Sequence, residues 1–177
     1  MHIAMHRDID AFDYAGRITK ALPSGVLLTT AADGRVNTMT IGWGTIGVEW
    51  GLPIFTAFVR RSRFSKTLLD RNPEFTVNVP MEDGMRDVLA FCGRESGRDR
   101  DKIAEMKLTM VEGRRVSVPA IREFPLTLEC RVRYSQEQVE GSIPEDVRTR
   151  FYPVGPDGRP DTHTAYYAEI VDAYLLE

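Results

Sequence analysis

The segment from Arg60 to Thr67, RRSRFSKT, carries groups that together could bind an anion. Its arginines and Lys66 supply positive charge, and Ser62 and Ser65 supply hydroxyls. A buried strand should end here and a helix begin, and the first N–H groups of a helix are free donors that favour negative charge. Arginine adds a planar fork that matches phosphate. The segment predicts a phosphate site, and the alternative is a solvated basic turn with Ser62 as a helix cap.

The stretch from residue 36 to residue 45, VNTMTIGWGT, lacks the clean apolar–polar alternation of a half-buried strand. It crowds small hydroxyls, an amide, glycines and an indole into one run. Beside a phosphate site, small residues would let a flat heteroaromatic ring approach the backbone. We therefore expect a strand that faces a ligand. The relevant residues are Asn37, Thr38, Met39, Thr40, Gly42 and Trp43. The alternative is a strand at a barrel rim, where glycines mark bends.

Hydrophobic spacing predicts about six strands and three or four short helices around these segments. The expected strands are 25–31, 36–43, 54–59, 74–80, 126–134 and 164–176, with a helix as the alternative for the last; the expected helices are 10–22, 64–71, 84–91 and 99–106. Asp33-Gly34 should turn the first hairpin. Residues 139–163 should form a long loop with a small hairpin at Asp157-Gly158. Hairpins dominate, which favours a mainly-β or α+β domain, an antiparallel barrel with peripheral helices.

Two strands alternate well enough to predict one solvated face each. In 74–80 we expect Phe75, Val77 and Val79 to point inward and Thr76 and Asn78 outward. In 126–134 the outward set should be Thr127, Glu129, Arg131 and Arg133.

Composition limits the classes of function. The chain has 177 residues, 42% of them hydrophobic, and a net charge of −3, which suits a single domain, 1–177, with a loose N-terminal arm at 1–9. A mildly acidic protein is a poor candidate for nucleic-acid or anionic-membrane binding. No apolar run approaches the roughly 20 residues that span a bilayer. With no secretion signal visible, Cys92 and Cys130 should be reduced thiols and the location cytoplasmic.

Three segments together resemble the flavin reductase-like family with an FMN-binding split barrel, in particular its flavoredoxin-like branch. They are VLLTTAADGRVNTMTIGWGT, LPIFTAFVRRSRFSKTLLDRNPEFTVNVP and CGRESGRDRDKIAEM. The resemblance implies that Asn37, Thr38, Met39 and Thr40 line the flavin ring and that Arg60, Ser62, Ser65 and Lys66 hold its phosphate. It also implies that a nearby loop contains Ser96, Gly97, Asp101 and Lys102. Phe64 stands where the family often has an aromatic hydroxyl.

The same resemblance implies an FMN-dependent oxidoreductase that passes electrons from NADH, NADPH or a protein donor through the flavin to a small-molecule or protein acceptor. It implies a homodimer with the flavin near the subunit interface. We expect no catalytic acid–base residue, because hydride transfer to a flavin needs stacking space more than a protein base. The alternatives are a non-catalytic FMN-binding electron carrier or sensor and, without cofactor, an acidic barrel used for protein contacts.

A few other residues could carry chemistry. His2 and His6 are four apart and could share a metal, although a loose terminus is the simpler interpretation. His163 should be a solvated loop residue. Cys92 could be a reactive thiol at a helix end, whereas Cys130 should be a small core residue.

Overall fold

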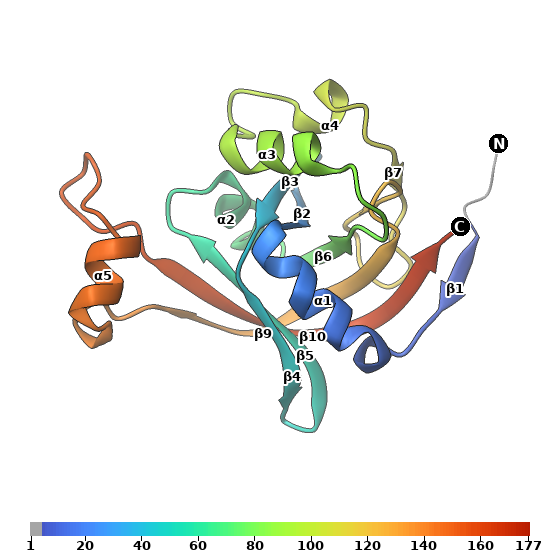
Figure 1. The fold of residues 1–177 in the computed structure, drawn as a ribbon, viewed down its shortest axis with the longest axis horizontal. Helices are drawn as coiled ribbons and strands as arrows, with labels where there is room; N and C mark the ends of the chain where they lie inside the picture. The colour runs from blue at the N-terminus through green and yellow to red at the C-terminus, as the bar shows by residue number, and fades with distance from the viewer. Residues whose placement is uncertain (1–4) are drawn as a thin grey trace.

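An eight-stranded antiparallel sheet, curved around a central core, forms the body of the molecule in the computed structural model (Figure 1), which describes residues 5–177. Its order is β3-β2-β6-β9-β10-β5-β4, with β1 paired to β10. The strands are β1 (His6–Asp8), β2 (Val26–Ala32), β3 (Arg35–Ile41), β4 (Gly44–Glu49), β5 (Leu52–Arg60), β6 (Glu74–Val79), β9 (Leu126–Glu137) and β10 (His163–Leu176). A short pair, β7 (Met110–Val111) and β8 (Ala120–Ile121), lies apart from this sheet. The predicted antiparallel architecture is confirmed.

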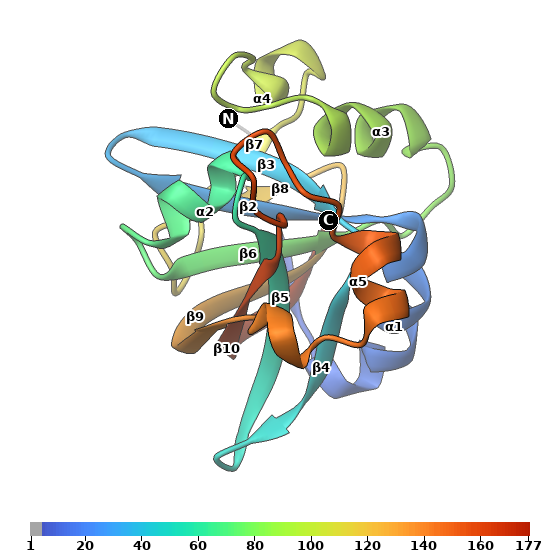
Figure 2. The same cartoon turned by 90° about the vertical axis from the view of Figure 1, so that its left-hand side faces the viewer.

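Short helices surround the sheet. They are α1 (Ala15–Ala21), α2 (Phe64–Leu69), α3 (Arg86–Arg94), α4 (Lys102–Glu105) and α5 (Glu145–Phe151), with 3₁₀ turns at Ala11–Tyr14, Leu22–Ser24 and Glu140–Ser142. In Figure 2, α3 and α4 lie over β2 and β3. Figure 1 shows α5 well apart from α1, at the far end of β9 and β10. No helix within residues 5–177 is both long and apolar enough to cross a membrane.

Two tight turns set the register of the hairpins. Asp33 and Gly34, at φ +52° and +73°, join β2 to β3, as the sequence predicts. Trp50 and Gly51 take the same conformation between β4 and β5. β4 was not predicted from the sequence, because its glycines interrupt the alternation of apolar and polar residues. A Cβ on Gly44 would lie 2.8 Å from the Phe55 ring, so a glycine is needed for β4 to pack on β5.

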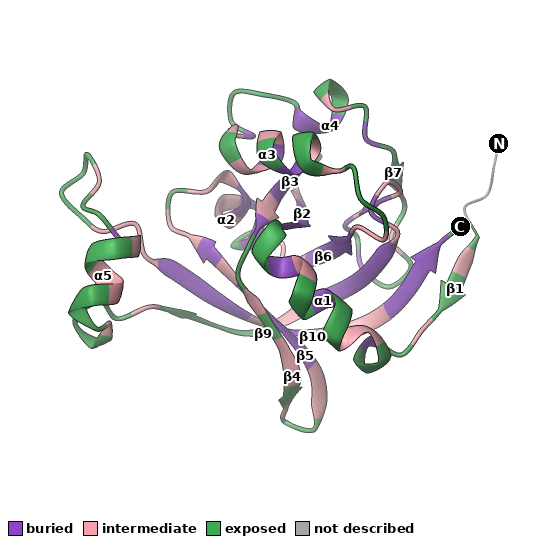
Figure 3. Ribbon diagram, in the orientation of Figure 1, coloured by how far each residue is buried: buried purple, intermediate pink, exposed green. Residues whose placement is uncertain are grey.

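The core has two layers, and this corrects the prediction of solvated faces on β6 and β9 (Figure 3). Inside the sheet, Phe55 and Phe75 pack edge to face, with ring centroids 6.4 Å apart. A second cluster, including Leu27, Cys92 and Phe124, lies on the outer face of β2. The segment from residue 108 to residue 125 covers β6 and β9 there. Four of the six side chains predicted to be solvated are consequently buried, namely Thr76, Asn78, Thr127 and Glu129. The prediction is correct for Arg131 and Arg133, whose side chains are 42% and 48% exposed.

Hydrogen bonds satisfy these buried polar groups. The Thr76 hydroxyl donates to the Pro119 carbonyl at 2.8 Å, and the Asn78 amide donates to Thr127 at 2.8 Å. The Glu129 carboxylate accepts backbone N–H bonds from three successive residues, Arg114 to Val116, at 2.6–3.1 Å, and a 2.8 Å bond from the Tyr174 hydroxyl. Glu129 therefore anchors the covering segment to the sheet.

Three terminal and loop predictions need correction. Residues His6–Asp8 form β1 and are not loose; the arm from 1 to 4, with His2, lies outside the described residues. The predicted loop 139–163 contains α5 and a small hairpin closed by a Val154–Pro160 bridge, so only the hairpin is confirmed. His163 begins β10 and is buried rather than solvated. The C-terminal segment is a strand, as predicted.

Candidate functional site

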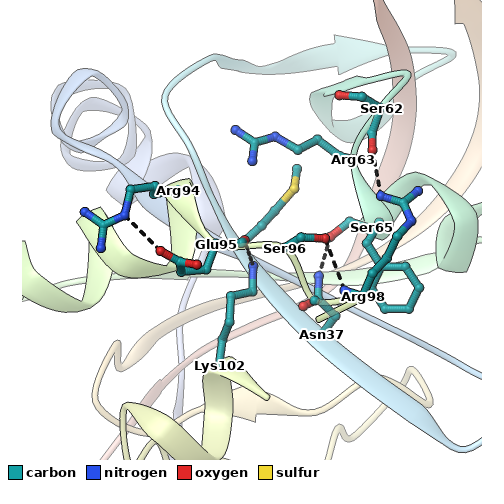
Figure 4. A pocket seen from close by; sticks show the side chains of 12 residues that line it. Asn37, Ser62, Arg63, Ser65, Arg94, Glu95, Ser96, Arg98 and Lys102 are labelled. Atoms are coloured by element: carbon teal, nitrogen blue, oxygen red, sulfur yellow. Dashed lines mark hydrogen bonds and ion pairs between the residues drawn. The ribbon is translucent and has the colours of Figure 1, made fainter. Parts of the chain in front are cut away.

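A basic hollow of about 210 Å³ opens between three segments of the fold (Figure 4). The first is β3, which contributes Asn37 and Met39. The second runs from the end of β5 into α2 and contributes Ser62–Ser65. The third is the connection from α3 to α4, from Arg94 to Arg98, with Lys102 from α4. We call this hollow the basic pocket.

A second hollow of about 150 Å³ adjoins the basic pocket, because Met39 and Arg63 line both. Its wall includes the consecutive residues 40–43, with Arg60 and His163 opposite. We call it the strand groove. Neither volume alone reaches the roughly 300 Å³ at which small-molecule sites begin, but the two lie side by side on Met39 and Arg63.

The strand groove follows a sheet edge. Among the described strands, β3 pairs with β2 and with no other strand, so its second edge carries unpaired N–H and C=O groups. Consecutive residues of β3 line the groove although their side chains point to opposite faces of the sheet. This is expected where a ligand-sized hollow lies along an exposed strand edge. Met39 reaches the barrel core, and the Thr40 hydroxyl donates to the Leu89 carbonyl at 2.7 Å. The main chain of β3 is thus open to a planar ligand.

Arg63 and Arg98 give the basic pocket an uncompensated positive charge. Arg63 donates from Nη1 to the Gly93 carbonyl at 2.8 Å, and Arg98 donates to the Ser62 carbonyl at 2.9 Å. Within residues 5–177 neither guanidinium forms an ion pair, whereas Arg94 pairs with Glu95 at 2.9 Å. Burial, with a smaller contribution from Arg60, lowers the pKa of Arg63. An anion would relieve both the burial penalty and the repulsion.

Lys102 adds a buried ammonium group to the same wall. It is 3% exposed, and its Nζ donates to the carbonyls of Cys92 and Glu95 at 3.0 and 3.2 Å. The Asp101 side chain accepts a bond from the Ala104 N–H at 3.0 Å, which caps α4 and positions Lys102 at its first turn. Burial lowers the Lys102 pKa to about 8. The charge on Lys102 therefore depends on what binds beside it.

Close packing fixes the floor of the pocket. The Asn37 amide donates to the Ser65 hydroxyl at 2.9 Å, and both residues are buried. Gly97 lies directly on them, because a Cβ there would be 2.1 Å from Asn37 Oδ1 and 2.8 Å from the Phe64 ring. The guanidinium carbons of Arg35 and Arg98 lie 4.5 and 5.5 Å from the Phe64 ring centroid. The α3–α4 connection is thereby held against β3.

The structure brings together six of the eight residues predicted to contact a cofactor. Those that line the basic pocket or the strand groove are Asn37, Met39, Thr40, Arg60, Ser62 and Ser65. Thr38 lies apart, fully buried, with its hydroxyl 3.0 Å from that of Thr29. Lys66 also lies apart, with its Nζ 2.8 Å from an Asp70 carboxylate oxygen. Ser62 is already engaged, because its N–H and Oγ donate to the two Asp161 carboxylate oxygens at 2.9 and 2.6 Å.

Several side chains that line these hollows were not in the predicted set, and three of them are charged or titratable groups of particular interest. Arg63 stands in the basic motif, so its charge was visible although its inward orientation was not. Arg98 comes from a connection whose path cannot be read from hydrophobic spacing. His163 lies in the strand groove, with Nδ1 2.9 Å from the Tyr152 hydroxyl, and burial lowers its pKa to about 4. The possibility of a reactive Cys92 is not supported, since burial raises the pKa of its thiol.

Comparison with known proteins decides the family. Residues 19–177 match the family model described as the flavin reductase like domain. The chain belongs to the flavin reductase-like family. An uncharacterized relative of this flavin reductase-like chain, from Archaeoglobus fulgidus, is 30% identical over 129 residues, which are 72% of each protein.

Solved structures agree with this assignment. Flavoredoxin from Methanosarcina acetivorans is 27% identical, with a TM-score of 0.65, over 85% of this chain and 67% of its own. An FMN-binding domain of a flavin reductases-like enzyme from Shewanella baltica is 16% identical, with a TM-score of 0.66, over 98% of this chain and 79% of its own. The second likeness concerns the fold alone. The predicted antiparallel split β-barrel with peripheral helices is confirmed.

Proposed function

We propose that this flavin reductase-like chain binds FMN and acts as an oxidoreductase, passing electrons from NADH, NADPH or a protein donor through the flavin to an acceptor. The observation that carries the proposal is the basic pocket, where the guanidinium groups of Arg63 and Arg98 donate to main-chain carbonyls and, within residues 5–177, form no ion pair. The family, the likeness to a flavoredoxin and the fold shared with an FMN-binding domain from Shewanella baltica support the choice of ligand.

The residues present fit FMN in one orientation. Its dianionic phosphate would lie in the basic pocket, held by Arg63, Ser65, Arg98 and Lys102, with Arg60 adding charge from the strand groove. The ring would follow the free edge of β3, from Asn37 to Gly42, with Met39 as an apolar contact. Thr38 would contribute through its backbone, since its hydroxyl is engaged with Thr29. Lys66 is omitted from this set because its ammonium is paired with Asp70.

Bound flavin would supply the two-electron chemistry, and the protein would supply binding and electrostatics. Arg63, which is half-buried, and Lys102, which is buried, would neutralise the phosphate, and a charge-assisted hydrogen bond is strong where the groups are removed from water. N–H groups along the β3 edge would favour negative charge on the polar edge of the ring. His163 is neutral at pH 7, because burial lowers its pKa to about 4, so it adds no repulsive charge beside Arg60.

A titration of the flavin-free protein with FMN and with riboflavin tests the placement of the phosphate. The two ligands share the ring and differ in the phosphate, so tight FMN binding with at least tenfold weaker riboflavin binding is the expected result. Visible absorption and flavin fluorescence report binding. Equal affinities would overturn the phosphate site, and no binding of either ligand would overturn the function.

A second candidate function, a non-catalytic electron carrier, is favoured by the 27% identity to a flavoredoxin. Stopped-flow mixing of the FMN-loaded protein with NADH or NADPH separates the two. Loss of flavin absorbance near 450 nm within about a second is expected of a reductase, whose turnover is typically 1 s⁻¹ or faster. A bound flavin that stays oxidised with both nicotinamides, yet is reduced by dithionite, identifies the carrier.

The chain also presents a surface suited to a second copy, and we propose a homodimer. β4 ends the sheet order, and the hairpin that it forms with β5 extends away from the body in Figure 1. At its tip Val48 and Trp50 are 70% and 57% exposed. Exposed apolar groups on an edge hairpin are typical of an interaction surface. Light scattering should give twice the chain mass, and Trp50→Glu should give the monomer; a monomeric wild-type protein at 100 µM would contradict the proposal.

A further inference from the structure

One hollow differs from the others in having no charged side chain in its wall. It has a volume of about 480 Å³ and lies between the end of α1, the β3–β4 connection and the residue after α5. Its apolar wall includes Leu22, Trp43, Phe58 and Tyr152. The basic pocket and the strand groove each contain at least two cationic side chains. We call this third hollow the apolar pocket.

The apolar pocket adjoins the strand groove, because Gly42, Trp43 and Phe58 line both. Gly42 lies in the shared wall. A Cβ there would meet only the Leu22 carbonyl oxygen, at an ordinary 3.5 Å, so packing does not require a glycine at this position. Any ring that follows the β3 edge would therefore end beside the apolar pocket.

Aromatic contacts hold the wall in place. The Trp43 ring packs against Phe151 and His163, with centroids 5.2 and 5.0 Å away. Tyr152, on the apolar side, is hydrogen-bonded to His163, on the groove side. The indole nevertheless stays 41% exposed, which is high for a ring held on two sides. A fixed but uncovered indole is available for stacking on a ligand.

The occupant follows from these features. Three aromatic side chains line the pocket and no charged side chain does; the Arg60 guanidinium lies in the strand groove, 5.9 and 5.3 Å from the ring centroids of Trp43 and Tyr152. This lining selects an uncharged planar molecule, since an ionised group would lose hydration without gaining a direct partner in the wall. A volume of 480 Å³ accommodates a small-molecule ligand. We propose that the apolar pocket binds an uncharged aromatic molecule, the second reactant of the flavin site. The role as reactant rests on the proposed function, whereas binding itself does not.

Calorimetry with two matched probes tests the proposal. 2-Naphthol is uncharged at pH 7, and 2-naphthoate has the same rings with a negative charge. The flavin-free protein should bind 2-naphthol at least tenfold more tightly than 2-naphthoate. Equal affinities, tighter binding of the anion, or no binding of 2-naphthol at 1 mM would overturn the proposal.

Variants on α1 locate the site. Thr19 is exposed and lines the apolar pocket, so the ring of Thr19→Phe should obstruct it and weaken 2-naphthol binding at least tenfold. Lys20→Phe places the same ring on the adjacent residue, outside this wall, and should leave 2-naphthol binding within twofold of wild type. Unchanged 2-naphthol binding to Thr19→Phe would overturn the location. Both variants should bind FMN as wild type does, so a failure of flavin binding is a separate result that contradicts only the proposed function.

Discussion

Replacing Arg63 with glutamine is the sharpest perturbation of the proposed phosphate site. The guanidinium has five N–H donors, and one of them is directed at the Gly93 carbonyl, so the others can serve a phosphate. A hydrogen bond to a charged group contributes about 1.5–3 kcal/mol. A loss of about 2 kcal/mol raises the FMN dissociation constant about 30-fold. Riboflavin has no phosphate, and its affinity should not change.

The chain offers a matched control for Arg63→Gln. Arg61 lies in the same turn, but its guanidinium pairs with Asp157 at 2.9 Å and lines neither hollow. Arg61→Gln should therefore bind FMN as wild type does. The assay is titration of each flavin-free protein with both flavins, followed by flavin fluorescence, with urea unfolding to show that each variant is folded. Unchanged FMN affinity in Arg63→Gln, or an equal loss of riboflavin affinity, would refute the reasoning.

Three further predictions concern titratable groups. Lys102 has a pKa of about 8 in the flavin-free protein, so it is mostly deprotonated at pH 9.5. Binding of a phosphate beside it must restore that proton, and FMN affinity should therefore fall about tenfold between pH 7.5 and 9.5. Lys102→Met should abolish that slope, and an unchanged slope would exclude Lys102. Burial lowers the His163 pKa to about 4, so below pH 6.5 the unfolded state binds more protons than the folded state. The free energy of unfolding should therefore fall by about 2 kcal/mol between pH 7 and pH 5. In urea titrations His163→Gln should not show this loss of unfolding free energy, and a loss equal to that of wild type would contradict the role of His163. Glu129→Gln should lower the unfolding free energy by about 2–4 kcal/mol, because the carboxylate accepts three amide N–H bonds, without changing FMN affinity. A change below about 0.5 kcal/mol in the same urea titrations would remove Glu129 as an anchor.

Local patterns predicted most of the sheet and little of what covers it. Strands such as β6 show their alternation directly, and Asp33-Gly34 fixes a hairpin through backbone conformations that few residues adopt. Alternation, however, shows only that two faces differ. It cannot show that the segment from residue 108 to residue 125 returns to cover the polar face, where Thr76 and Glu129 find their partners. Such burial depends on contacts between residues distant in sequence.

The candidate site shows the same division. The basic motif and β3 were identified because anion binding and close approach of a ring require particular residue types near each other in sequence. Arg98 and His163 reach the site from 36 and 101 positions beyond Ser62, through a loop and a strand start whose paths depend on tertiary packing. Lys66 illustrates a different limit of the sequence. Its spacing suits a phosphate ligand, but the i, i+4 carboxylate of Asp70 competes for the same charge.

The Asp161 carboxylate occupies the two Ser62 donors that an anionic ligand could otherwise use. Two donors cannot serve a carboxylate and a phosphate at once, so a ligand that takes the Ser62 hydroxyl must first detach Asp161 and the hairpin around it. The tethered carboxylate is always nearby, and apparent affinity is reduced by the fraction of molecules in which it remains bound. Asp161→Ala would therefore leave the Ser62 donors available and raise the apparent affinity of a ligand that binds them. The same change would remove two hydrogen bonds that hold the hairpin, which would become less ordered.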